Sequence, residues 1–242
     1  PEYGLSKRRF VSFFTFALNY RLHGLDVTGY HIFNLSVHIL NALLVYFFVL
    51  LTFKTPFLKG SALKKYSRYI AFVAALFFIS HPVQTEAVTY IMQRLASLAA
   101  FFYIGSLVLY IKWRLKAEQQ TPPLSSPLTL RGDRRGLLYV LSLLCALLAL
   151  KAKENAVTLP AAILLYELFF FGGKLKNRLV RVAPFFLLLI VIPIGLLETG
   201  IPLKTIFFGV SPEARTGWKG SAFDGDYVRL AHPRAEYLFT QF

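Results

Sequence analysis

The sequence has 242 residues, of which 56% are hydrophobic, 16% aromatic and only 16% charged, whereas soluble domains average roughly 25% charged residues. This composition excludes an ordinary soluble domain and indicates a membrane protein. The formal net charge of +15 does not indicate a nucleic-acid partner, because the Lys and Arg residues are confined to short stretches between apolar runs.

Most basic residues lie in three hydrophilic stretches, 54–68, 111–135 and 172–181, which together contain fifteen of the 27 Lys and Arg residues and two acidic residues. The positive-inside rule places such stretches on the cytoplasmic side. The other connections, including 80–86 and 151–155, then face the opposite side. We therefore expect the candidate functional residues to gather at the non-cytoplasmic face.

The apolar runs predict an all-α polytopic membrane protein with about six transmembrane helices and both termini non-cytoplasmic. A helix needs about 20 residues to cross the ~30 Å hydrocarbon core. Residues 1–29 are predicted to form an outer amphipathic segment, 30–197 the transmembrane domain and 198–242 an outer, partly folded segment. Residues 121–136 are predicted to be a flexible inner linker. The six predicted spans are 30–53, 69–80 extended back through 62–68, 85–110, 136–150, 156–171 and 181–197.

The first predicted span carries a polar stripe formed by His31, Asn34, His38 and Asn41, whose spacing puts them on one helix face. Lipid would penalise this stripe, so we expect it to face other helices or a wet cavity. The two histidines are ~10.5 Å apart in helical rise, which is too far for one metal ion. Interhelical hydrogen bonding is therefore favoured.

A second polar face begins at Glu86, in the first turn of a predicted helix capped by Thr85, and continues to Arg94. Arg94 would lie ~12 Å deeper along this helix, where an unpaired Arg costs ~2.5–3.5 kcal/mol at mid-bilayer. We therefore expect an anionic partner for it. The alternative is an interfacial amphipathic helix over 84–94, with the span beginning at Leu95 and Arg94 among the head groups.

The predicted outer corner 151–155 places Lys153 and Glu154 immediately before another helix. A Lys can neutralise a departing phosphate, and a Glu can orient it or act as a base. The alternative is that a short connection between two spans simply needs polar residues. His81, next to Pro82, lies at the lip of the same predicted face. A Gly-rich phosphate loop and a Gly-x-Ser-x-Gly elbow are both missing from the sequence, so soluble nucleotide-dependent chemistry is not supported.

Four segments carry a family resemblance: RFVSFFTFALNY at 9–20, GYHIFN at 29–34, HPVQTEAV at 81–88 and KENAVTLP at 153–160. Together they resemble the membrane part of tetratricopeptide-repeat-containing O-mannosyltransferase-like proteins of the GT-C glycosyltransferase superfamily. The likeness covers most of the chain, including YLFTQF at 237–242. Phe10 departs from the pattern, since a Pro is expected after the Arg.

The resemblance implies a GT-C-like fold, a polyprenyl-phosphate-linked sugar donor and an acceptor such as a protein Ser or Thr. It places the active site at the periplasmic face of a bacterial inner membrane or the lumenal face of the endoplasmic reticulum. It also implies an acidic catalytic loop upstream and helical repeats downstream, so we expect this chain to be a membrane-domain piece that is inactive alone. Whether a divalent metal takes part is left open. The predicted catalytic residues are Glu86, Glu154 and His81, and the predicted lipid-phosphate contacts are Arg94, Lys153 and Arg9.

Two other functions are compatible with the same residues. A transporter or lipid flippase would use the polar stripe as a pathway, although transporter helices are typically broken near the midplane and the breaks expected here lie at helix ends. A non-catalytic membrane scaffold would use the stripe only to hold helices together.

Overall fold

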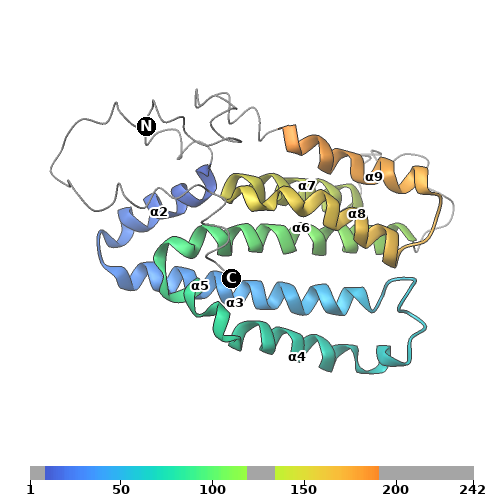
Figure 1. Cartoon of the computed structure of the whole chain (residues 1–242), viewed down its shortest axis with the longest axis horizontal. Helices are drawn as coiled ribbons and strands as arrows, with labels where there is room; N and C mark the ends of the chain where they lie inside the picture. The colour runs from blue at the N-terminus through green and yellow to red at the C-terminus, as the bar shows by residue number, and fades with distance from the viewer. Residues whose placement is uncertain (1–8, 119–133, 191–242) are drawn as a thin grey trace, which may run out of the picture. The chain divides into compact units, whose positions relative to one another are not determined.

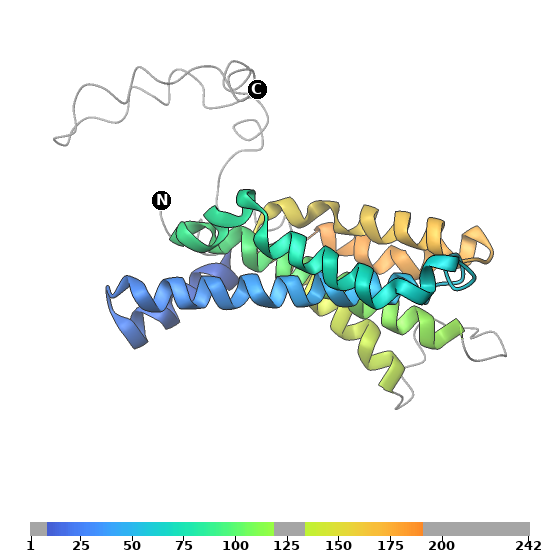
Figure 2. The same cartoon turned by 90° about the horizontal axis from the view of Figure 1, so that it is seen from below.

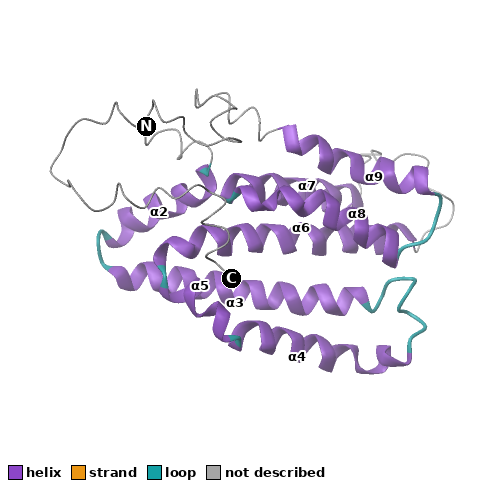
Figure 3. Ribbon diagram, viewed as in Figure 1, coloured by secondary structure: helices purple, strands orange, loops and turns teal. Residues whose placement is uncertain are grey.

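The computed structural model describes residues 9–118 and 134–190, all within the first of two compact units, Pro1–Pro193 and Ile194–Phe242. The described residues are helical, with no strand among them (Figure 3). The predicted segment 198–242, most of the linker 121–136 and the end of the sixth predicted span lie outside the described residues. The α-helices are α2 (Phe10–His23), α3 (Val27–Thr52), α4 (Ser67–Ser80), α5 (Thr85–Thr89), α6 (Arg94–Glu118), α7 (Arg134–Ala152), α8 (Leu159–Phe170) and α9 (Leu175–Leu187), and the 3-10 helices are Ala62–Tyr66, Pro82–Gln84, Ile91–Gln93, Glu154–Thr158 and Leu188–Ile190.

Two of these helical segments are long and apolar enough to cross a membrane, α3 and the continuous stretch Ile91–Glu118. A third candidate is the pair Ala62–Ser80 and Pro82–Thr89, which is bent by 55° at the break between its two parts. The apolar part of α7, Gly136–Ala152, is shorter. The described residues thus form a helical protein with two or three candidate spans, and the fuller count of six stays a prediction.

The turn between α2 and α3 is set by its local sequence. Gly24 has a φ of 58°, a left-handed conformation that glycine adopts without a steric penalty. Asp26 then caps α3, its side chain accepting a hydrogen bond from the Thr28 backbone N–H at 2.9 Å. This hydrogen bond lowers the pKa of the Asp26 carboxyl, because it favours the charged form. Gly29 leaves room for the His23 ring, which would lie 2.5 Å from an added Cβ.

Helix α6 packs against α3, α7 and α8 (Figure 1). Against α7 the contact is close because serines meet: Ser106 Oγ donates to the Ser142 carbonyl at 2.9 Å, and Ser142 Oγ donates to the Ser106 carbonyl at 2.8 Å. Small polar residues of this kind allow helices to approach closely in a bilayer. Farther along, the rings of Trp113 and Tyr139 lie 4.6 Å apart.

The pairing of the helices places their ends in two groups. Helices α3 and α6 run parallel, since Asn34 meets Arg94 and Leu51 clusters with Val108. Helices α4 and α7 run the opposite way. The starts of α3 and α6 therefore meet the ends of α4 and α7, close to α2 and α5 (Figures 1 and 2).

We call this end the motif end, because all six predicted catalytic and phosphate-contacting residues lie there. The opposite end contains the loop 53–66, the end of α6 and the start of α9, and we call it the basic end. The described parts of the basic stretches, 54–68, 111–118, 134–135 and 172–181, are thus separated from these six residues by the length of the helices.

Candidate functional site at the motif end

Arg94, the first residue of α6, is fully buried at the motif end. Its Nε donates to Asn34 Oδ1 at 2.9 Å. Its Nη1 donates to the Thr15 carbonyl at 3.3 Å, and its Nη2 donates to the Tyr30 carbonyl at 3.1 Å. One guanidinium therefore joins α2, α3 and α6.

Aromatic rings complete the surroundings of this guanidinium. The Arg94 Cζ lies 4.4 Å from the Phe16 ring centroid and 4.3 Å from that of Phe33, distances typical of cation–π interactions. We expected an anionic partner, but within the described ranges Arg94 instead contacts carbonyl oxygens and aromatic rings. Its predicted phosphate contact stays a prediction, since a phosphate could reach the fully buried guanidinium only if the surrounding residues moved.

The helix predicted to continue from Thr85 to Tyr110 is broken in the structure. Helix α5 ends at Thr89, Tyr90 is extended, and a 3-10 turn precedes α6. The continuous-helix prediction was therefore wrong, and the alternative with a separate short helix before the span is closer. Sequence periodicity could not reveal the break, because the side chains that hydrogen-bond to its exposed backbone carbonyls lie on another helix.

Those side chains are the polar stripe of α3, which contacts backbone carbonyls of the neighbouring segments. His31 Nδ1 lies 3.2 Å from the Val88 carbonyl, and His38 Nε2 lies 3.3 Å from the Ile79 carbonyl. Asn34 Nδ2 is 3.5 Å from the carbonyls of both Tyr90 and Ile91, and Asn41 Nδ2 donates to the Ser97 carbonyl at 3.0 Å. Helix ends leave carbonyls without helical partners, and lipid offers none. The predicted interhelical hydrogen bonding of the stripe is confirmed.

The two asparagines of the stripe are expected to respond differently to substitution. Asn34→Leu should lower the free energy of unfolding by about 2–3 kcal/mol, because Arg94 Nε loses a buried acceptor. Asn41→Leu should change it by less than about 1 kcal/mol, since the Ser97 carbonyl also accepts within α6 and Asn41 Oδ1 has no partner among the described residues. Unfolding of the detergent-purified protein measures both, and equal losses would contradict the assignment.

A second contact at the motif end joins Arg9, which precedes α2, to Glu154 at the start of the 3-10 helix after α7. Arg9 Nε lies 3.1 and 3.0 Å from the two carboxylate oxygens, and Nη2 lies 2.9 Å from Oε2. The two side chains are 31% and 42% exposed, so the pair is accessible from outside the bundle. Ser12 Oγ donates to the Ala152 carbonyl at 3.1 Å beneath it, which fixes α2 against the end of α7. Arg9 and Glu154, predicted separately, thus form one unit.

The remaining predicted site residues lie nearer the surface of the motif end. Lys153 is half-buried at the N-cap of the 3-10 helix Glu154–Thr158. Glu86 is exposed in the first turn of α5. His81 caps the preceding 3-10 turn, its Nδ1 accepting from the Val83 backbone N–H at 3.2 Å. These three side chains are available to a ligand, whereas Arg94 is enclosed.

Sequence reasoning missed a buried ionic cluster around Glu167 of α8, which is fully buried. Its Oε1 accepts from Arg114 Nε at 2.9 Å and from Arg181 Nη1 at 3.3 Å, and its Oε2 accepts from the Tyr110 hydroxyl at 3.1 Å. The signal was present, since an ionised residue within an apolar run requires a partner. The cluster joins α6, α8 and α9 near the basic end, away from the predicted site.

Within residues 9–118 and 134–190, no group of three or more His, Cys, Asp and Glu side chains is placed to hold a metal ion. The carboxylate of Glu154 is instead bound by Arg9.

The chain is similar to several curated proteins. It is 32% identical over 163 residues to the protein O-mannosyl-transferase Tmtc3 of Drosophila melanogaster, a match that covers 64% of this chain and 16% of that protein. It is 36% identical over 106 residues to the protein O-mannosyl-transferase F38B6.6 of Caenorhabditis elegans, covering 43% of this chain and 14% of the relative. It is 31% identical over 166 residues to human protein O-mannosyl-transferase TMTC2, a match that covers 68% of this chain and 17% of that protein.

The chain spans about a sixth of the length of these relatives. No family model and no solved structure matches it. The relatives bear the name of the family that the four sequence segments resemble. The resemblance is therefore confirmed, and the chain is a homologue of the TMTC protein O-mannosyl-transferases.

Proposed function

We propose that the chain forms part of an integral-membrane glycosyltransferase that acts in protein O-mannosylation. The sugar comes from a polyprenyl-phosphate-linked donor and passes to a Ser or Thr hydroxyl of a protein at the non-cytoplasmic face. The proposal is supported by the names of the relatives. The observation that carries it is the gathering of Arg9, Glu154, Lys153, His81 and Glu86 at one end of the helices, opposite the basic loops.

The proposed topology has six crossings, a GT-C-like arrangement and both termini non-cytoplasmic, with domain boundaries at 29/30 and 197/198. It puts the basic end in the cytoplasm, as the positive-inside rule requires. The motif end then faces the periplasm or the endoplasmic-reticulum lumen. A lipid-anchored phosphate and a water-exposed protein acceptor can meet only at such a membrane surface.

In the proposed reaction, the acceptor hydroxyl oxygen forms a bond to the anomeric carbon while the bond from that carbon to the donor phosphate oxygen breaks. The lipid phosphate leaves with the bonding electron pair, and the hydroxyl proton passes to a carboxylate. Cations placed where the negative charge develops lower the barrier. Lys153 and Arg9 are two cations at the motif end that are not fully buried.

The structure suggests a division of roles among the predicted residues. Glu154 holds two nitrogens of Arg9, so we propose that it positions Arg9 toward the phosphate. Glu86 and His81 lie at the same end of the helices, and we propose that they receive or orient the acceptor. We propose that Arg94 acts indirectly, by holding α2 in place through its hydrogen bond to the Thr15 carbonyl.

A transfer assay tests this function. The full-length protein, reconstituted in liposomes with polyprenyl-phosphate mannose, should transfer labelled mannose to a Ser/Thr-containing peptide. Lys153→Gln is expected to reduce the rate by about 10²-fold, the usual effect of removing one group that stabilises a developing negative charge.

Lys54→Gln is the matched control, because Lys54 is exposed at the basic end and should leave the rate unchanged. Wild-type transfer by both Lys153→Gln and Glu154→Gln, with normal folding, would contradict the proposed site. A protein that transfers no sugar but scrambles lipids between leaflets would instead be a flippase.

A further inference from the structure

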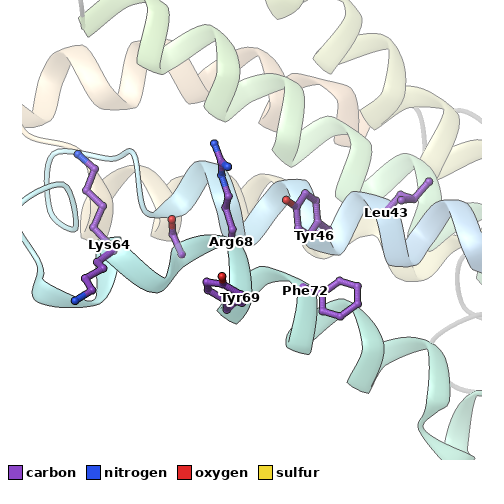
Figure 4. A pocket seen from close by; sticks show the side chains of 8 residues that line it. Leu43, Tyr46, Lys64, Arg68, Tyr69 and Phe72 are labelled. Atoms are coloured by element: carbon purple, nitrogen blue, oxygen red, sulfur yellow. The ribbon is translucent and has the colours of Figure 1, made fainter.

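A pocket of about 800 Å³ lies between α3 and the segment that leads into α4 (Figure 4). Its volume is within the range of small-molecule sites, about 300–1,000 Å³. Its lining residues come from the second half of α3, the 3-10 helix Ala62–Tyr66 and the start of α4, and none of them belongs to the motif end. Its lining residues are Leu43, Tyr46, Lys64, Lys65, Ser67, Arg68, Tyr69 and Phe72.

Three cations line this pocket: Lys64, Lys65 and Arg68. All three are exposed, and no ion pair within the described ranges involves them. Lys65 Nζ lies 5.2 Å from the centroid of the Tyr66 ring, a neutral partner. The pocket thus has unneutralised positive charge at its rim, which complements an anion.

The other lining residues are tyrosines and, farther from the cations, apolar side chains. From Lys64, the labelled side chains follow in the order Arg68 and Tyr69, then Tyr46 and Phe72, then Leu43 (Figure 4). Tyr residues are enriched where a bilayer changes from head group to hydrocarbon. The order from cation to tyrosine to apolar side chain matches the order from phosphate to glycerol to acyl chain in a phospholipid.

We propose that this pocket binds one anionic phospholipid at the cytoplasmic leaflet. Lys64, Lys65 and Arg68 contact the head-group phosphate and its further negative charge, and the acyl chains lie against Leu43 and Phe72. A free soluble anion would leave the apolar part of the pocket uncovered. A zwitterionic lipid would fill the apolar part but supply no net charge for three cations.

Native mass spectrometry of the full chain, released from nanodiscs, tests the proposal. With equal amounts of phosphatidylserine and phosphatidylcholine supplied, wild type should retain one phosphatidylserine in preference. A direct hydrogen bond between a cationic side chain and a charged head group is worth roughly tenfold or more in affinity. The variant Lys64→Gln/Lys65→Gln/Arg68→Gln should therefore retain this lipid at least about tenfold less.

The matched control is Lys54→Gln/Lys59→Gln/Lys112→Gln, which removes the same charge near the same end but outside this pocket. It should retain phosphatidylserine as wild type does, and a melting curve for each variant verifies folding. Equal losses in the two triple variants would show unspecific surface attraction and overturn the proposal. Displacement of the lipid by millimolar glycerophosphoserine would also overturn it, because that outcome identifies a site for a soluble anion.

Discussion

Arg94→Gln is expected to destabilise the protein by about 3–5 kcal/mol, since the buried acceptors that Arg94 satisfies would lose their donors. These acceptors are Asn34 Oδ1 and the carbonyls of Thr15 and Tyr30. A glutamine can replace one donor but cannot reach α2 and α3 together. The measurement is unfolding of the detergent-purified protein, combined with limited proteolysis at the turn between α2 and α3.

Arg21→Gln is the control for this experiment, because Arg21 lies in α2 but is exposed, so its removal should change stability by less than about 0.5 kcal/mol.

Arg94→Lys separates the two roles of Arg94. A lysine keeps the charge but lacks the planar fork, so it should recover sugar transfer if Arg94 contacts the phosphate. If Arg94 positions α2, stability and transfer should fall together. An Arg94→Gln protein as stable as wild type would refute the positioning role.

Glu167→Gln is expected to have an effect of similar size. The substitution leaves Arg114, whose side chain is 6% exposed, without its buried carboxylate partner. Breaking a buried ion pair by removing one member costs about 3–5 kcal/mol. Thermal unfolding of the purified protein, with loss of protection in α8 and α9 by hydrogen exchange, should detect it.

Glu118→Gln provides the matched control, because Glu118 binds the same Arg114 but is 43% exposed. Its loss should cost less than about 1 kcal/mol. Removing the whole cluster, by combining Glu167→Leu, Arg114→Met, Arg181→Met and Tyr110→Phe, should recover much of the stability, since replacing buried ionic groups by apolar side chains is often neutral. If this combined variant is less stable than Glu167→Gln alone, the loss does not come from an unpaired charge.

The helices were largely predictable from local sequence. Apolar runs located α3, α7 and α8, and Asp26 and Gly24 mark the turn before α3 by their chemistry. The polar stripe was also predictable, because His31 and His38 fall at helical spacing and cannot face lipid. The grouping of Arg9 with Glu154 at one end followed from charge topology, although nothing local indicated that they would form an ion pair.

What escaped prediction depends on contacts between distant segments. The break at Tyr90 exists because Asn34 and His31, more than fifty residues earlier, lie beside the carbonyls that it exposes. Arg94 was expected to need an anion, because reasoning about its own helix alone could not foresee three oxygens and the rings of Phe16 and Phe33 from α2 and α3. The partners of Glu167 come from two other helices for the same reason.

The hydrogen bonds from α3 also constrain how the chain can be assembled. Domains form progressively from the N-terminus during synthesis, so α3 reaches the bilayer before α4 and α5. The donors on His31, Asn34 and His38 are then already in place when the bent segment, with its exposed carbonyls, leaves the translocation channel. An order of insertion with α4 first would put bare peptide groups into hydrocarbon, and the position of the stripe on the earlier helix avoids that intermediate.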